Sequence, residues 1–318
     1  MKINSVLGPI DTADLGQTLM HEHVSCVDWS LRMNFEESFF NYDEIKELVV
    51  RLFKQARAHG VTTMVDGTPI NLGRDIRLIR DVAEESGVNV IASTGFYYQF
   101  LPNIAKRSDH QIKSLLLKEC TEGINGTGIL PGIFKAGVEE PGITDYNRKL
   151  LRITGEAAGE SGLPLFCHTC PSLKLGDEAL DIFLETGLSP NRIIIGHSGD
   201  CGDVDYLESL LDKGVWLGMD RFDPPCEFFA TFEVRTKTVA ELCRRGWAHR
   251  LFLAHDASVH LGFYDYWGKH RQSIIEKSDG KFTEIHRNVL PELLRLGVSQ
   301  EDIDRMLIHN PRNFFEGN

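Results

Sequence analysis

The stretch GIFKAG, residues 132–137, ends a short apolar run with a lysine, Lys135. Four similar apolar runs end on a histidine or an aspartate, in LMHEHV (residues 19–24), FCHTC (166–170), IIGHSGD (194–200) and FLAHDAS (252–258). Each run has the length and composition of a buried β-strand. In a barrel of parallel strands the C-terminal ends meet at one face, so we expect these polar side chains to converge there.

Strand-like and helix-like segments alternate along the chain. We predict strands at residues 17–20, 62–66, 88–94, 132–135, 164–168, 192–196, 215–219 and 251–254, and helices at residues 43–57, 146–160, 204–213, 236–245, 291–296 and 299–307. Strands that are apolar on both faces indicate a parallel sheet. Eight such units in 318 residues predict an α/β fold, a (β/α)8 TIM barrel, as a single domain over residues 1–318. We expect residues 257–280 to form a loop or short helix over the active face.

The residues at the strand ends have the chemistry of metal ligands, because zinc and similar ions take imidazole and carboxylate groups. His21 and His23 are two residues apart, so both rings lie on the same side of an extended segment. Asp256 leaves the last strand, which neighbours the first in a closed barrel, and completes one site. His168 and His197 leave consecutive strands and serve a second metal.

Lys135 would sit among these ligands. A free ammonium group would repel two cations, whereas a neutral amine can react with CO2 to give a carbamate. Such an N6-carboxylysine is an anionic ligand that can bridge two metals roughly 3.5–4 Å apart. A single histidine is more often a hydrogen-bonded barrel residue than a ligand. It is the joint placement of all six residues at strand ends that favours a binuclear hydrolytic site.

Other histidines and cysteines are not assigned to the site. His255 precedes Asp256, and strand alternation points it away from the ligands, so we interpret it as structural. Cys167 and Cys170 form a C-x-x-C around His168, but without the helical context of a redox motif. We interpret Cys167 as a small strand residue and Cys170 as a loop thiol.

Composition excludes several classes of function. The net charge is −12, with no run of Lys or Arg, so nucleic acid and anionic membranes are poor partners. No run of 18 apolar residues is present, and the N-terminus has no signal-peptide pattern. Seven scattered cysteines suit a reducing compartment. We therefore expect a cytoplasmic protein that acts on a small molecule.

The chain resembles the phosphotriesterase family of the amidohydrolase superfamily, near its phosphotriesterase-like lactonase and phosphotriesterase-homology branches. The matching strings are GQTLMHEHV, VDGTPINLGRD, GIFKAGVEEPGIT, LFCHT, IIGHSGD, LGMDRF, LAHDAS and HNPRNFF, which run from about residue 8 to the C-terminus. The resemblance implies that His21, His23 and Asp256 hold a buried metal and that His168 and His197 hold a more exposed one. Carboxylated Lys135 and a hydroxide would bridge the two ions. Asp256 would also shuttle the proton after attack.

Two positions bear on the substrate. Organophosphate-degrading members carry a histidine after strand seven, where this chain has Arg221, as in the lactonase branch. Tyr97 resembles a lactonase active-site tyrosine, although Tyr98 is an alternative. Both Tyr97 and Arg221 are therefore expected to bind substrate. The competing interpretations are packing for Tyr97 and a salt bridge to Asp220 for Arg221.

These features together predict a metal-dependent lactonase with weak promiscuous phosphotriesterase activity. Zn²⁺ is the expected metal, with Mn²⁺, Co²⁺ and Fe as alternatives, and CO2 is needed for lysine carboxylation. Arg221, Lys269, His270 and Arg271 would give the mouth a positive field, which favours phosphorylated or carboxylated sugar lactones over acyl-homoserine lactones. Tyr264, Tyr266 and Trp267 would line a substrate pocket or pack the loop. An amidase or N-acyl hydrolase and a non-catalytic metal-binding barrel are the alternatives, and the resemblance leaves room for a homodimer.

Overall fold

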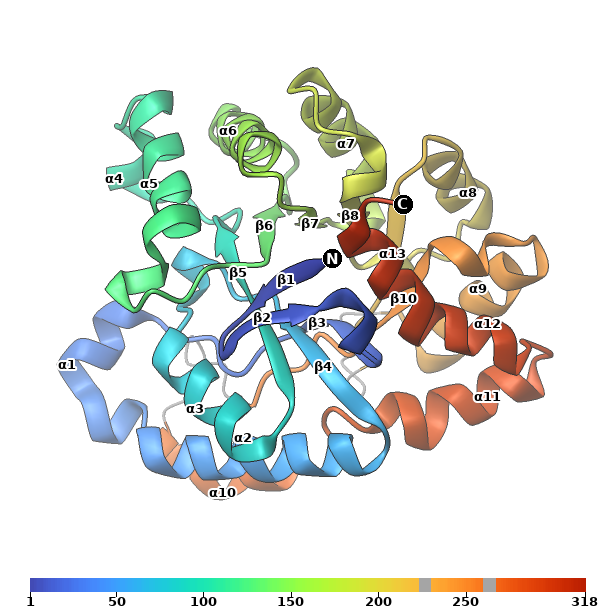
Figure 1. Cartoon of the computed structure of the whole chain (residues 1–318), viewed down its shortest axis with the longest axis horizontal. Coiled ribbons are helices and arrows are strands. Elements are labelled where there is room, and N and C mark those ends of the chain that lie inside the picture. Colours follow the sequence, from blue (N-terminus) through green and yellow to red (C-terminus); the bar gives the residue numbers. More distant parts are fainter. Residues whose placement is uncertain (223–229, 260–266) are drawn as a thin grey trace.

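Eight parallel strands form one sheet in the computed structural model, which describes residues 1–222, 230–259 and 267–318, with side chains from residue 270 onward in the last range (Figure 1). The strands pair in chain order from β3 to β10. They are β3 (Gln17–Glu22), β4 (Val61–Asp66), β5 (Asn89–Gly95), β6 (Ile133–Gly137), β7 (Leu165–His168), β8 (Ile193–Ile195), β9 (Trp216–Met219) and β10 (Leu251–Leu253). Each overlaps a predicted strand, so the TIM-barrel prediction is confirmed.

The barrel closes at the C-terminal ends of its first and last strands. The Asp256 amide donates to the His21 carbonyl at 3.0 Å, and the His23 amide donates to the Ala257 carbonyl at 2.9 Å. His23 and Ser258 form an isolated parallel bridge. The backbone that closes the barrel therefore carries three of the predicted metal ligands and fixes their spacing.

Helices surround the sheet. They are α1 (Trp29–Phe39), α2 (Tyr42–Ala58), α3 (Ile76–Ser86), α4 (Pro102–Ala105), α5 (Asp109–Glu122), α6 (Asp145–Ser161), α7 (Gly176–Glu185), α8 (Val204–Asp212), α9 (Phe232–Arg244), α10 (Trp267–Lys277), α11 (Leu290–Arg295), α12 (Gln300–Asp304) and α13 (Asn310–Glu316). All six predicted helices are present, and α2 begins where the Asn41 side chain accepts the Glu44 amide. None of the described helices is long and apolar enough to cross a membrane.

The barrel interior contains one cluster of large buried side chains. Every strand contributes one of them, and together they are Met20, Val65, Ile91, Ile133, Phe166, Ile194, Trp216 and Phe252. The hairpin of β1 (Lys2–Ser5) and β2 (Gly8–Asp11), together with α13, covers the N-terminal end of this cluster (Figure 1). The opposite, C-terminal end of the barrel is where the polar residues collect.

The segment after β10 differs in part from its prediction. Residues 267–277 form α10, an eleven-residue helix that lies beside α1 rather than a short helix confined to the mouth. Residues 260–266 of the predicted covering loop lie outside the described residues. Helix α1 itself follows β3 and was not predicted.

Candidate metal centre

The six predicted ligands gather at the C-terminal mouth of the barrel. His23 Nε2 lies 3.1 Å from Asp256 Oδ1, and His21 Nε2 lies 3.4 Å from the same oxygen. On the other side, His197 Nε2 lies 2.5 Å from His168 Nδ1. His21, His23 and Asp256 thus lie together, His168 and His197 are neighbours, and a further group joins His21 to His197 through Asp220.

Lys135 lies between the two sets with 1% of its surface exposed. Its Nζ is 2.6 Å from His21 Nε2 and 4.1 Å from the centre of the Phe166 ring. Burial lowers the pKa of the Lys135 ammonium to about 8. About a tenth of the amine is therefore neutral at pH 7, far more than for an exposed lysine, and the neutral amine is the form that reacts with CO2.

The donor set fits divalent metal ions. Imidazole and carboxylate atoms of His21, His23 and Asp256 lie within 4.8 Å of one another. Burial lowers the pKa values of His21 and His168 to about 4, so both rings are neutral near pH 7, as metal ligands must be. At His23, burial is outweighed by Cys26 and the Asp256 carboxylate, which raise the pKa to about 10, so a metal ion there would have to displace a proton. His168 Nδ1 and His197 Nε2 lie only 2.5 Å apart. Both atoms carry a lone pair in the neutral rings, so a shared proton or a cation would stabilise their close approach.

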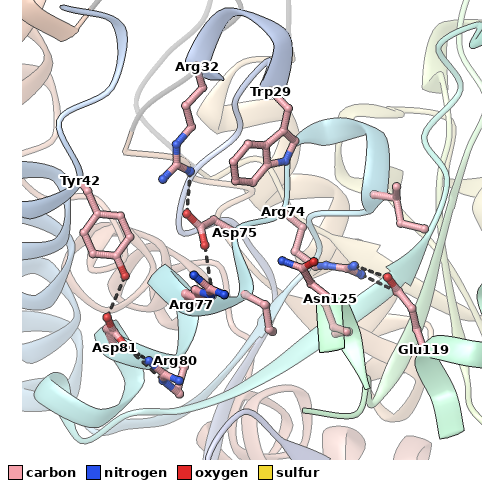
Figure 2. A pocket seen from close by; sticks show the side chains of 13 residues that line it. Trp29, Arg32, Tyr42, Arg74, Asp75, Arg77, Arg80, Asp81, Glu119 and Asn125 are labelled. Carbon is pink, nitrogen blue, oxygen red and sulfur yellow. Dashed lines mark hydrogen bonds and ion pairs between the residues drawn. The ribbon is translucent and has the colours of Figure 1, made fainter. Parts of the chain in front are cut away.

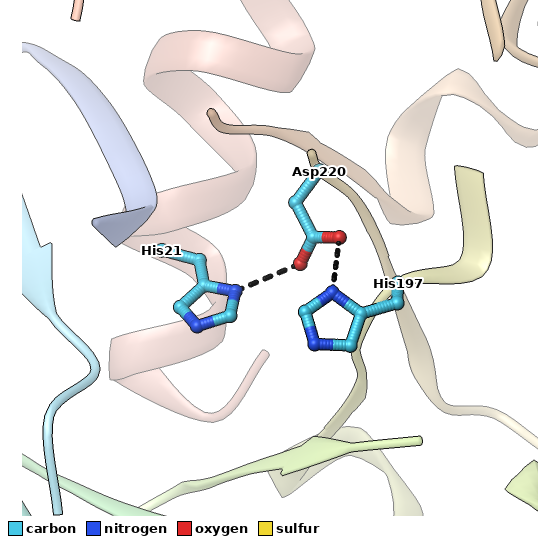
Figure 3. Close-up of side chains that lie close together, drawn as sticks. All are labelled: His21, His197 and Asp220. Atoms are coloured by element: carbon cyan, nitrogen blue, oxygen red, sulfur yellow. Dashed lines mark hydrogen bonds and ion pairs between the residues drawn. The ribbon is translucent and has the colours of Figure 1, made fainter. Parts of the chain in front are cut away.

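Asp220 is a residue of the site that the sequence analysis did not assign. Its two carboxylate oxygens accept hydrogen bonds from His21 Nδ1, at 2.9 Å, and from His197 Nδ1, at 2.8 Å (Figure 3). It is completely buried. A carboxylate on the far ring nitrogen fixes the tautomer and leaves Nε2 for a metal. The sequence signal that could have identified Asp220 is strand alternation. Every second residue of β9 and its extension faces inward, and this places Asp220 on the same side as Trp216 and Gly218.

Tyr97 and Tyr98 both contact His168. The Tyr97 hydroxyl lies 3.3 Å from Nδ1 and 3.4 Å from Nε2 of that ring, and Tyr98 stacks against it at a centroid distance of 5.8 Å. The Asn71 side chain holds the Tyr97 backbone by accepting from its amide at 2.6 Å. The hydroxyl of Tyr97 therefore lies next to a proposed metal ligand.

Arg221 does not form the predicted salt bridge with Asp220. Its side chain is 10% exposed and instead contacts Asp200, at 3.0 Å, and Asp256, at 3.4 Å. The reason is the backbone: Arg221 has φ +66°, which turns its side chain off the strand alternation. Arg221 therefore connects the Asp256 carboxylate to a second buried acid.

Three residues of the site adopt the left-handed backbone conformation that favours glycine. They are His197 (φ 61°), Arg221 (φ 66°) and Asp256 (φ 54°). Each costs on the order of 1 kcal/mol relative to an ordinary conformation. Such strain collects at functional sites, where the surrounding packing holds side chains in directions that regular strands do not allow.

The predicted positive field at the mouth is wrong for the residues that can be judged. Arg221 is paired as above, and Arg271 on α10 pairs with Glu44 at 2.5 Å. His270 also lies on α10. Tyr264 and Tyr266, and the side chains of Trp267 and Lys269, fall outside the part of the chain that the structure describes. Acidic partners therefore neutralise the two arginines.

A cavity of about 550 Å³ is lined by Glu139, which contacts His168, and by Arg221, which contacts Asp256. Among its lining residues four are acidic and two are basic: Glu139, Glu140, Asp200, Asp203, Lys174 and Arg221. Lys174 pairs with Asp203 at 2.6 Å. The described wall of this cavity is therefore acidic overall.

A larger cavity, of about 760 Å³, lies on the flank of the barrel between α1, α3 and the turn at Ile124–Gly126 (Figure 2). Its charged residues are largely paired with one another, as in Arg32 with Asp75 and Arg74 with Glu119, each at 2.6 Å. Neither cavity is lined by the converging ligands themselves, but Glu139 and Arg221, which contact His168 and Asp256, line the smaller one. We therefore place the chemistry beside the smaller cavity.

The structural interpretation of His255 is consistent with its contacts. Its Nδ1 donates to Glu22 at 2.7 Å, and its Nε2 accepts the Ile285 amide at 3.1 Å, on the side away from the ligands. Cys167 and Cys170 are free thiols, and burial raises the pKa of Cys167 to about 12. Neither thiol has the lowered pKa of a redox-active cysteine.

A TIM barrel with imidazoles and carboxylates converging at its C-terminal mouth defines a class of metal-dependent hydrolases. The chain belongs to the phosphotriesterase family, whose description matches residues 1–315. It is 35% identical to the phosphotriesterase homology protein of Mycobacterium tuberculosis, over 99% of this chain and 98% of that one. It is 33% identical to an aryldialkylphosphatase of Saccharolobus solfataricus, over 96% of each chain. A solved phosphotriesterase structure from Mycobacterium tuberculosis superposes with a TM-score of 0.92, at 35% identity and over 99% of this chain and 98% of that one.

Proposed function

We propose that the chain is a binuclear metal-dependent lactonase. The observation that carries the proposal is the buried Lys135 amine between two sets of ligands, since a carbamate there would bridge two ions. His21, His23 and Asp256 would hold the buried ion, and His168 and His197 the more exposed one. Zn²⁺ is the metal that this nitrogen-rich donor set favours.

The reaction proposed is attack of water on a lactone carbonyl. Divalent ions at these residues would polarise the carbonyl oxygen and lower the pKa of a water molecule to roughly 7. Asp256 accepts the proton of the attacking water as the new C–O bond forms. When the acyl C–O bond of the ring breaks, Asp256 returns the proton to the leaving alkoxide, and a hydroxy acid results.

Arg221 and Tyr97 support a lactone over a phosphotriester. Arg221 stands where organophosphate-degrading relatives carry a histidine, and its contact with Asp256 Oδ2 keeps that carboxylate oriented. The Tyr97 hydroxyl lies over His168, where it can donate a hydrogen bond to a substrate oxygen. The acidic wall of the neighbouring cavity favours a neutral lactone, such as an acyl-homoserine lactone, over a phosphorylated or carboxylated one.

An N-acyl hydrolase is the second candidate. A relative named N-acetyltaurine hydrolase, from Xenopus tropicalis, is 25% identical over 98% of this chain and 97% of its own. The same ligands and the same proton transfer would serve an amide, with an amine in place of the alkoxide as leaving group. Substrate preference alone separates the two candidates.

The deciding experiment is hydrolysis by the Zn²⁺- or Mn²⁺-loaded protein, followed by proton release. The panel holds neutral lactones, anionic sugar lactones, N-acyl amino compounds and paraoxon. We expect turnover of neutral lactones to exceed that of paraoxon and to stop on chelation. Activity confined to N-acyl compounds would overturn the lactone assignment, and an Asp256→Asn chain within severalfold of wild type would overturn the mechanism.

The carbamate has its own test. Metal-loaded protein prepared with ¹³C-labelled bicarbonate should show a carbamate carbon by NMR, and Lys135→Met should lack it. The Lys135→Met chain should also take up fewer metal ions, because the bridging ligand is gone. Two tightly bound ions in this variant would contradict a bridging role.

A further inference from the structure

We propose that Glu139 is a positioning residue that holds the His168 ring with Nδ1 toward the site and thereby sets the affinity of the more exposed metal position. Glu139 follows β6, the strand that carries Lys135, and its Oε2 lies 2.9 Å from His168 Nε2. This inference rests on the proposed function, because it concerns one of the two metal positions proposed there.

The four imidazoles are not oriented alike. His21 and His197 use Nδ1 for Asp220, and His23 uses Nδ1 for the Thr68 hydroxyl at 2.8 Å, so all three present Nε2 to the site.

His168 is reversed. Its Nε2–H donates to Glu139, and its Nδ1 faces His197 Nε2 at 2.5 Å. A ring that must present Nδ1 needs a partner on Nε2, and Glu139 supplies it.

The other described contacts of this ring do not replace Glu139. The His197 contact falls on Nδ1, and the Tyr97 hydroxyl lies at 3.3 and 3.4 Å from the two nitrogens without favouring Nε2. Tyr98 stacks on the ring face. Among the described residues, Glu139 is the carboxylate that contacts His168, and it does so at Nε2.

Glu139 is itself held in place. Its Oε1 accepts the backbone amide of Glu140 at 3.1 Å, which fixes the carboxylate relative to the loop. Its other oxygen, Oε2, is thereby directed at His168 Nε2, and a carboxylate is a strong acceptor for an imidazole N–H.

Glu139 differs from Asp220 in exposure and in reach. Asp220 is completely buried and holds one histidine of each proposed metal position, whereas Glu139 is 25% exposed and holds His168 alone. Without Glu139, water can compete for Nε2 and the ring can flip. The loss should therefore fall on the exposed position and spare the buried one.

The test is metal binding by the full-length apo protein, without substrate. Zn²⁺ is titrated against a chromophoric chelator into wild type, Glu139→Ala, Glu139→Gln and the neighbouring control Glu140→Ala. We expect Glu139→Ala to weaken the second ion by about 10- to 100-fold and to leave the first unchanged. Glu139→Gln should recover part of the loss, because its amide oxygen still accepts from Nε2–H. Glu140→Ala should bind as wild type does.

The outcomes separate this inference from the function on which it rests. Two tight ions in both wild type and Glu139→Ala would overturn the role of Glu139 and leave the binuclear proposal standing. A wild type that takes up no second ion would overturn both. A melting curve of each apo variant shows whether it is folded, and the Glu139→Gln chain, which keeps the size of the side chain, decides the case if Glu139→Ala does not fold.

Discussion

Replacing Gly196 by alanine should destabilise the protein, mainly through a clash with Phe166 and also through a tight contact, at 3.0 Å, with the Cys167 carbonyl oxygen. An alanine Cβ there would lie 2.2 Å from Phe166 Cε1 and 2.5 Å from its Cζ. Ordinary carbon–carbon contacts are about 3.5–4.0 Å, so the ring would have to move by roughly 1.5 Å. Gly196 does not have a positive φ, so alanine causes no backbone strain and the effect is due to packing.

The ring has little room to move. Phe166 is almost completely buried, its ring lies 4.1 Å from Lys135 Nζ, and its centroid is 4.2 Å from that of His21. Overpacking of this kind costs about 1–3 kcal/mol. We therefore expect Gly196→Ala to lower the free energy of unfolding by about 2 kcal/mol. We also expect weaker metal uptake, because the displaced ring pushes against two proposed ligands.

Urea denaturation of the apo protein measures the first effect. A matched control is Gly159→Ala in α6, where a Cβ meets no atom within 4 Å and alanine should stabilise the helix by about 0.5–1 kcal/mol. The double change Gly196→Ala with Phe166→Leu should recover part of the loss, because leucine lacks the clashing ring atoms. A Gly196→Ala chain as stable as wild type would refute the reasoning.

Three further changes test other parts of the molecule. Asp220→Asn should weaken metal binding by about 10- to 100-fold, because one amide oxygen cannot accept from two imidazoles; equilibrium dialysis with metal analysis checks this, and unchanged uptake would contradict it. Arg221→Met should lower the free energy of unfolding by about 3 kcal/mol, because buried Asp200 loses one of its two arginine partners. Urea denaturation measures this, and a loss under about 1 kcal/mol would count against the prediction. Burial lowers the pKa of His286 to about 4, whereas in the unfolded chain it is roughly 6.5. The contribution of His286 to the free energy of unfolding is therefore complete above pH ~6.5 and is lost as the pH falls toward 4. His286→Gln should therefore reduce the fall in stability between pH 7 and pH 4.5 by about 1–2 kcal/mol, and parallel curves for the two proteins would argue against it.

The sequence predicted the barrel because its strands are short apolar runs that end on polar residues. Buried parallel strands need apolar side chains on both faces, and this pattern is visible without any long-range information. The grouping of ligands followed from strand order alone, since β3 and β10 must meet when the barrel closes. Helix α1 escaped prediction because Met33 and Phe35 remain exposed on it, so its apolar residues do not mark one buried face.

The contacts among the site residues could not be predicted in the same way. Asp220 and Arg221 are neighbours in the sequence, yet the left-handed backbone at Arg221 sends its side chain to Asp200 and Asp256. Strand alternation cannot predict this change of direction. A residue with a Cβ adopts the left-handed conformation only where the surrounding packing compensates its cost in free energy. The pairing of Glu139 with His168 likewise joins the loop after β6 to the end of β7, and the sequence gives no sign of this contact.

Asp220 and Glu139, the two carboxylates that hold the far nitrogens of the histidines, differ in how many histidines they contact. Asp220 has no contact with solvent and joins His21 to His197, so any change at Asp220 reaches both proposed metal positions. Glu139 lines the cavity beside the site and holds only His168, so a change there reaches one position. We therefore expect substitutions in the loop after β6 to change both the metal affinity of the exposed position and the substrate preference. The metal affinity of the buried position should stay the same.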